Sequence, residues 1–346
     1  MSVLLNRRSF SLAASAAVLA ACARAPSAEA GHVNVYSSRH YETDQLIYAA
    51  FKQATGIDVR VLPAPGDQLL ERLRAEGDQT EADLIVTADA GNLFRLKDAG
   101  LLQPVITPAL EADVPARLHD REGYWWAFAK RARIIIYRKG VIDPATITSM
   151  DDLATARFRG QVCVRSSSNV YNLSLLAARI ERQGADAARA WARGVRANFA
   201  RDPQGGDIEQ IKAVAAGACQ VAIANHYYFL RLQNSEDPAE RAAAEAVGMI
   251  FPDQAGAGAH INISGAGVSA YAQRRDNAVR LLEFLVSDEA QRLLVPLNVE
   301  FPIRADIPPT AALAEIGRFK EEDIPLDALG RHQGEAAQIF EEVGWR

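Results

Sequence analysis

The chain has 346 residues, of which 49% are hydrophobic and 23% are charged. This composition supports a large buried core, and the length exceeds that of one average domain, so we expect two globular lobes. The formal net charge is −5 and the basic residues are scattered along the sequence. A nucleic-acid-binding protein needs a concentrated basic surface, so the charge pattern excludes that class.

The first residues have the features of an export signal. Arg7 and Arg8, followed by Ser9 and Phe10, resemble a twin-arginine motif, and an apolar run continues to Ala21. This run is too short to span a membrane stably. We therefore expect residues 1–21 to be a signal peptide; an ordinary secretory signal is the alternative, and either one exports the protein.

The end of the apolar run resembles a lipobox. Small residues precede Cys22, whose thiol would accept a diacylglyceryl group and become the mature N-terminus. Residues 22–31 are small, polar and contain proline, which is typical of a flexible linker. We expect a periplasmic protein tethered to a membrane by lipid at Cys22; a chance cysteine is the alternative.

The other two cysteines, Cys163 and Cys219, lie in apolar segments with a strand-like pattern. We expect buried free thiols there. An oxidising compartment also permits a disulfide between them, but the sequence does not decide the pairing.

From His32 onward, short β-like runs alternate with amphipathic helical patterns. The pattern predicts three strand–helix pairs, with strands at 32–38, 58–64 and 83–89 and helices at 43–56, 67–77 and 90–100. Such alternation is typical of a parallel sheet with helices on its faces. Gly56 and Gly100 stand where the first and third helices should end.

The segment 124–140 breaks this alternation with a long aromatic and β-branched run, which we interpret as a crossover between lobes. A second α/β series follows, and the glycine-rich segment 251–270 is predicted to return the chain to the first lobe. We expect lobe one to contain residues 32–128 and 262–300, and lobe two residues 129–261 and 301–346. No heptad pattern indicates a coiled coil, so a monomer is expected.

Tyrosines follow three of the predicted strands, just before a helix begins. Tyr41 follows the first strand, Tyr171 follows the strand at 160–165, and Tyr227 and Tyr228 follow the strand at 219–225. Ligands of open α/β sheets bind at the carboxyl ends of the strands, so all three junctions can face one crevice. Asn225 is predicted to cap the helix that carries Tyr227 and Tyr228.

Grouped tyrosines are suited to a hard, highly charged cation. A phenol is un-ionised at neutral pH, with a pKa of about 10, but a nearby Fe³⁺ stabilises the phenolate. The hard anionic oxygen matches the hard trivalent ion. A single tyrosine is better explained as a core residue, and we interpret four others in this way: Tyr36, Tyr48, Tyr124 and Tyr137.

Other residues near the junctions are candidates for binding the metal or supporting its ligands, but each could also be an ordinary surface or structural residue. His40 is a candidate metal ligand or an exposed loop histidine, and His226 is interpreted as supporting or structural. Arg39 and Arg133 are candidates for holding phenolates or a bound carbonate by charge-assisted hydrogen bonds, or are solvated surface residues.

Several segments together resemble the ferric-iron-binding proteins of bacterial ABC importers: 36–44, 129–140, 166–177, 221–232, 251–270 and 338–345. The resemblance implies an α/β fold, the type II periplasmic binding protein fold, with two Rossmann-like lobes, a hinge and an interlobe cleft. It also implies that Fe³⁺ is the transported ligand and that an ABC permease and ATPase are the partners. The iron-binding tyrosines of the family fall on Tyr41, Tyr171, Tyr227 and Tyr228, with His40 where some members have a histidine ligand.

Three other functions are open alternatives. A binding protein for a polyamine, thiamine or phosphonate would need convergent charged groups, for which Asp44, Asp67 and Asp89 are available. An exported metalloenzyme would agree with the twin-arginine motif, but the sequence has no GxSxG, dinucleotide or P-loop motif, so we expect no enzyme. A purely structural envelope protein would leave the tyrosines at the strand ends unexplained.

Overall fold

The computed structural model describes residues 31–39 and 41–346. The predicted signal peptide, Cys22 and most of the predicted linker therefore lie outside the described residues. His40 lies outside them too.

The N-terminal part forms the predicted parallel strands. β1 (His32–Ser37) lies between β2 (Asp58–Pro63) and β3 (Leu84–Thr87) and is parallel to both. The helices α1 (Asp44–Thr55), α2 (Gly66–Glu76) and α3 (Ala90–Asp98) follow these strands in turn. α1 ends at Gly56, whose φ of 77° is in the left-handed region that a residue without Cβ adopts at low cost.

The next strand, β5 (Trp126–Arg138), is the long segment predicted to cross the molecule. Trp126 to Ala132 pair with β9 (Ile261–Ser269), whereas Arg133 to Tyr137 pair with β7 (Val221–Asn225). Its isoleucines are fully buried and alternate between two cores, because successive strand side chains point to opposite faces: Ile135 packs in one core, and Ile134 and Ile136 pack in the other. β5 thus links the two halves of one sheet.

The remaining elements complete a sheet with the order β2-β1-β3-β9-β5-β7-β6, in which β4 pairs with β9 and β8 with β5. The other strands are β4 (Leu102–Gln103), β6 (Val162–Cys163) and β8 (Val247–Ile250). The other helices are α4 (Pro108–Asp113), α5 (Val170–Gln183), α6 (Ala185–Ala197), α7 (Asp207–Ala215), α8 (His226–Gln233), α9 (Pro238–Glu245), α10 (Arg275–Val286), α11 (Asp288–Asn298), α12 (Ala311–Glu315), α13 (Ala328–Arg331) and α14 (Gln333–Val343).

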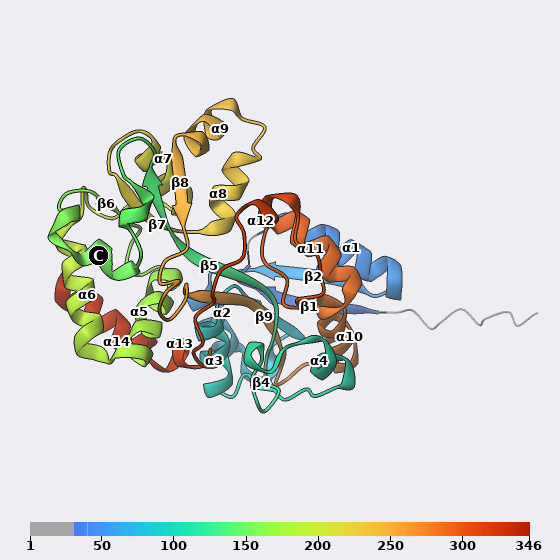
Figure 1. Cartoon of the computed structure of the whole chain (residues 1–346). Coiled ribbons are helices and arrows are strands. Elements are labelled where there is room, and N and C mark those ends of the chain that lie inside the picture. The colour runs from blue at the N-terminus through green and yellow to red at the C-terminus, as the bar shows by residue number, and fades with distance from the viewer. Residues whose placement is uncertain (1–30, 40) are drawn as a thin grey trace, which may run out of the picture.

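The helices gather around two halves of the molecule (Figure 1). β5 runs through the centre; α5, α6, α7, α8, α9 and α14 surround its C-terminal end, and α1, α2, α3, α4 and α10 surround the other half. β9 returns the chain to the strands of the first half, where it pairs with β3. The predicted lobe boundaries stay a prediction.

The C-terminal segment connects both halves. α14 packs on α5 and α6, and Phe340 and Trp345 are buried in the core beneath them. α13 packs on both α3 and α5. Within residues 31–39 and 41–346, no helix is long and apolar enough to cross a membrane.

The cysteines differ from the prediction. Cys163 and Cys219 form a disulfide, so the expectation of two free buried thiols is wrong. The physical reason is that β6 and β7 are neighbouring parallel strands that pair Cys163 with Ala222. This pairing brings Cys219, just before β7, to a Cα–Cα distance of 5.9 Å from Cys163. The pairing depends on strand neighbours that a single sequence does not reveal.

Candidate functional site

The site begins where β7 ends and α8 begins. Asn225 occupies the N-cap position of α8, but its side chain makes no capping hydrogen bond, contrary to the prediction. Its Oδ1 instead accepts from Arg133 at 3.3 Å, and its backbone N–H donates to Asp207 at 2.7 Å. The amide oxygen of Asn225 thus accepts from the buried Arg133 and not from a backbone N–H of α8.

Tyr227 and Tyr228 both lie in the first turn of α8. Their ring centroids are 4.2 Å apart, so the turn places both rings on the same side. Tyr227 is fully buried, whereas Tyr228 is half-buried. Two adjacent residues of a strand would point to opposite faces, so the helical turn is what allows the two phenols to share one site.

Tyr171 reaches the same place from α5. Asn169 caps this helix by accepting from the backbone N–H of Tyr171 at 3.0 Å, which fixes the first turn. The phenolic oxygens of Tyr171 and Tyr227 are 3.3 Å apart. Two predicted junctions of the C-terminal half therefore converge.

Tyr41 completes the group from the N-terminal half, between β1 and α1. Its ring meets the ring of Tyr227 edge-on, with 5.7 Å between the centroids. Tyr41 is 7% and Tyr171 is 6% exposed. All four tyrosines predicted from the strand ends are thus brought together, while the position of His40 lies outside the described residues.

Burial favours the neutral form of three of the four phenols, those of Tyr41, Tyr227 and Tyr228. Burial, followed by the charges of Glu300 and Tyr171, raises the pKa of Tyr41 well above its usual value. Burial and the neighbouring Tyr171 and Tyr41 raise the pKa of Tyr227 in the same way. Burial also raises the pKa of Tyr228. A cation that binds to these phenolic oxygens must displace their protons. Only a strongly charged cation interacts with the phenolates strongly enough to offset the free energy of deprotonation.

Buried arginines surround the phenols. The guanidinium of Arg39 lies 4.1 Å from the ring centroid of Tyr41 and forms ion pairs with Asp44 and Glu300, both at 2.8 Å. Arg131 lies 5.5 Å from the centroid of Tyr171 and also contacts Glu300, at 3.4 Å. Positive charge beside a phenolate stabilises it, so these side chains support ionisation of the phenols when a metal is present.

Arg133 and Arg165 also lie near Tyr171. Their guanidinium groups are 5.7 Å and 5.3 Å from its ring centroid, respectively. Both pair with the fully buried carboxylate of Asp207, at 2.7 Å and 3.1 Å. Arg39 and Arg133 are both buried, so the alternative that they are solvated surface residues is wrong.

A cavity of about 280 Å³ opens beside the tyrosines. Tyr171, Tyr228 and Arg165 line it from one half, and Ser38 and Asp89 line it from the other. The tyrosine cluster is therefore reached through space that both halves enclose.

The three carboxylates considered for a charged solute each interact with other side chains, although Asp67 and Asp89 both line the cavity. Asp44 pairs with Arg39, and Asp67 pairs with Arg95 at 2.8 Å. Asp89 caps α3 and accepts from Ser174 and Asn262, each at 2.6 Å. Among the residues that the structure describes, no group of three or more histidine, cysteine, aspartate or glutamate side chains could hold a metal ion. The donors available at the site are phenols.

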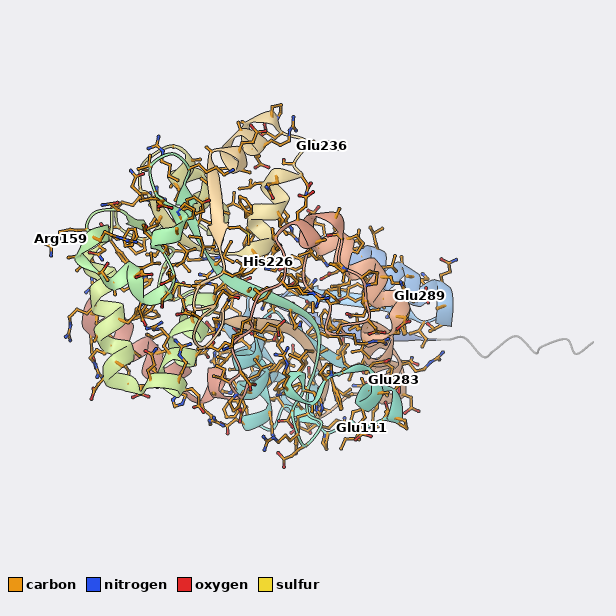
Figure 2. The ribbon with its side chains drawn as sticks, in the orientation of Figure 1. Glu111, Arg159, His226, Glu236, Glu283 and Glu289 are labelled. Atoms are coloured by element: carbon orange, nitrogen blue, oxygen red, sulfur yellow. A yellow bond between two sulfur atoms is a disulfide. The ribbon has the colours of Figure 1, made fainter. Side chains whose placement is uncertain are left out.

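His226 has a structural position, as predicted. Figure 2 shows it near the centre of the molecule beside β5. Its Nδ1 accepts from the N–H of Ala132 at 3.2 Å, and its Nε2 lies 3.0 Å from the carbonyl oxygen of Val299. Burial lowers the pKa of His226 to about 3, so the ring is neutral and both nitrogens are used by the backbone.

Residues 36–292 match the model of the bacterial extracellular solute-binding protein family. The chain belongs to this family. The position of the tyrosine cluster between two α/β halves agrees with that membership.

Relatives of this solute-binding protein include iron proteins. It is 42% identical to iron uptake protein A1 of Synechocystis over 97% of this chain and 96% of that protein. A solved Trichodesmium protein in complex with iron and citrate ligands is 43% identical, with a TM-score of 0.87 over 91% of this chain and 100% of that chain. The Campylobacter jejuni ferric binding protein is 41% identical, with a TM-score of 0.88 over the same shares. The predicted resemblance and the type II periplasmic binding protein fold are confirmed.

Five charged residues at the site of this solute-binding protein were not predicted from the sequence: Arg131, Arg165, Asp207, Arg231 and Glu300. Arg131 stands two residues before Arg133 on β5, and strand periodicity alone places both on one face. Arg231 stands one helical turn after Tyr227 and lies 4.6 Å from the ring centroid of Tyr41. Asp207 and Glu300 come from distant segments, and no local pattern points to them.

Proposed function

We propose that this solute-binding protein captures Fe³⁺ between its two halves and delivers it to an ABC importer. The observation that supports it best is the convergence of Tyr41, Tyr171, Tyr227 and Tyr228, whose oxygens are hard donors that become anionic beside a trivalent cation. The iron-binding names of the similar proteins agree with this proposal. His40, next to Tyr41 in the sequence, is a further candidate ligand.

The arrangement supports an order of events. Tyr171, Tyr227 and Tyr228 come from α5 and α8 in the C-terminal half and can capture the ion together. Tyr41 comes from the N-terminal half and completes the metal shell when the halves close. Delivery to the permease then requires opening, and reduction to Fe²⁺ would weaken the bonds to the phenolates. We assign no enzymatic step to the site.

A titration with ferric citrate, followed by visible absorption, tests this proposal. We expect a phenolate-to-iron charge-transfer band that saturates at about one iron per chain. The Tyr227→Phe, Tyr228→Phe double variant should lose the band. The matched control is Tyr124→Phe, Tyr271→Phe, which removes two hydroxyls outside the site. A wild-type titration without colour or saturation would contradict the proposal.

We also propose that an anion binds to the iron together with the tyrosines. The cavity lined by Arg165, Tyr171 and Tyr228 offers a place for it, and carbonate is a candidate co-ligand. Titration in carbonate-free buffer with and without added bicarbonate tests this: a band shift on bicarbonate addition supports it, and an unchanged spectrum contradicts it.

We also propose export by the twin-arginine pathway and a lipid tether at Cys22 in the periplasm. Replacing Arg7 and Arg8 with lysine should leave the precursor in the cytoplasm. Replacing Cys22 with serine should abolish labelling by radioactive palmitate and release the protein from the membrane fraction. Labelling that persists in the Cys22 variant would contradict the tether. We expect the folded protein to be a monomer.

A further inference from the structure

Asp207 lies at the centre of the contacts behind the tyrosines. It is the first residue of α7, and its side chain is fully buried. Its carboxylate accepts from Arg133 at 2.7 Å, from Arg165 at 3.1 Å and from the backbone N–H of Asn225 at 2.7 Å. One side chain thus joins a β5 arginine, the segment before α5 and the strand end that leads into α8.

Each of these contacts leads to a tyrosine. Asn225 is two residues before Tyr227, so the bond from its N–H to Asp207 fixes the turn that carries Tyr227 and Tyr228. Arg133 also donates to Asn172 at 2.8 Å, and Asn172 is the neighbour of Tyr171 on α5.

Arg165 reaches Tyr171 in a second way. The side-chain amide of Asn172 donates to the carbonyl oxygens of Arg165 and Ser166, both at 3.0 Å, which holds this segment against α5. The guanidinium itself lies 5.3 Å from the ring centroid of Tyr171. The three tyrosines of the C-terminal half are therefore all supported through Asp207.

The charges in this group do not cancel. Two guanidinium groups, of Arg133 and Arg165, share one carboxylate, so the group carries a formal charge of +1 beside the phenols. The group lies against the site: the guanidinium of Arg165 is 5.3 Å from the ring centroid of Tyr171, and Arg165 lines the same cavity as Tyr171 and Tyr228. A change in this group therefore changes the potential at the metal position.

We infer that Asp207 is a positioning residue for the iron site: it preorganises the three tyrosines of the C-terminal half and sets the charge that decides between Fe³⁺ and Fe²⁺. The inference rests on the proposed function and extends it. Residues that support metal ligands from behind change affinity by about 10–100-fold when they are replaced. A carboxylate near the metal also favours the higher oxidation state, since that state carries more positive charge.

The test compares charge variants of nearly constant shape. Asp207→Asn keeps an oxygen for the Asn225 N–H but raises the group to a charge of +2, and Arg165→Gln lowers it to zero. The double variant returns the charge to +1. For each, the Fe³⁺ affinity is measured by competition with citrate, and the reduction potential of the bound iron is measured by spectroelectrochemistry.

We expect Asp207→Asn to weaken Fe³⁺ binding by about 10–100-fold and to raise the reduction potential. Arg165→Gln should lower the potential, and the double variant should return it toward the wild-type value. The matched control is Asp83→Asn, because Asp83 is another fully buried carboxylate that accepts from an arginine and a backbone N–H, at 3.3 Å and 2.9 Å. It should leave the potential unchanged.

A purely structural role would give a different result. Potentials that do not follow the charge, or an Asp83→Asn effect equal to that of Asp207→Asn, would overturn the inference. If Asp207→Asn fails to fold, the lowered potential of Arg165→Gln still decides it. A wild-type protein that binds no iron would instead refute the proposed function.

Discussion

The phenolic oxygens of Tyr171 and Tyr227 lie 3.3 Å apart, although the two residues come from different helices and are separated by 56 positions along the chain. In the proposed iron site, these two oxygens would be neighbouring ligands of the metal once both are ionised. Since both side chains are almost completely buried, their positions are set by packing before any ion arrives.

Replacing either of these tyrosines with phenylalanine should weaken iron binding by more than the 10–100-fold that loss of a supporting residue costs. Because both act on the same ion, the double variant should lose less than the sum of the two single losses. Competition titrations of wild type, both single variants and the double variant measure this. Additive losses would indicate that the two phenols bind different ligands.

Iron affinity should fall as the pH falls, because Fe³⁺ must displace protons from phenols whose pKa is raised by burial, as for Tyr41 and Tyr227. Competition with citrate between about pH 5 and 8 tests this, with proton release followed in weakly buffered solution. The result must be corrected for protonation of citrate. Binding without proton release would show that the phenols stay neutral.

The iron-free protein should lose stability at alkaline pH. The pKa of Tyr41 and Tyr227 is raised in the folded state above the unfolded value of about 10, so their contribution is complete below pH 10 and is lost as the pH rises toward the folded pKa. The slope should be at most about 1.4 kcal/mol per pH unit for each group. Urea midpoints above pH 9 measure it, and Tyr41→Phe should reduce the slope.

Acid should destabilise the protein through His226. Its pKa is lowered from 6.5 to about 3, so between these values the unfolded chain binds a proton that the folded chain does not. Stability should therefore fall as the pH falls through this window, by a total on the order of 5 kcal/mol. Urea midpoints between pH 7 and 4 measure this, and His226→Gln should flatten the dependence; an equal slope in the variant would contradict the assignment.

The Cys163–Cys219 disulfide should stabilise the fold by about 4 kcal/mol, because it closes a loop of 56 residues in the unfolded chain. Urea unfolding of the Cys163→Ala, Cys219→Ala double variant and of its oxidised parent tests this. Both proteins carry Cys22→Ser. Two free thiols in the native parent, detected by thiol titration, would contradict the bond itself.

The sequence predicts the parts of this protein that have local periodicity. The strand–helix alternation from His32 to Gly100 and the four tyrosines at the strand ends follow from patterns that a few residues carry. The structure brings those four tyrosines together.

The surroundings of the site depend on long-range pairing instead. Glu300 meets Arg39 and Arg131, and Asp207 meets Arg133 and Arg165, although the partners lie far apart in the sequence. The disulfide likewise requires β6 and β7 to be neighbours. A single sequence carries no signal for such partners, because each residue by itself has an ordinary context.

The most direct test of the central claim is anomalous diffraction at the iron absorption edge from crystals grown with ferric citrate. We expect one strong peak per chain, within bonding distance of the phenolic oxygens of Tyr41, Tyr171, Tyr227 and Tyr228. The same data would show whether His40 is a ligand. An anomalous peak elsewhere, or none in protein that was loaded with iron, would contradict the assignment of these tyrosines as the iron site.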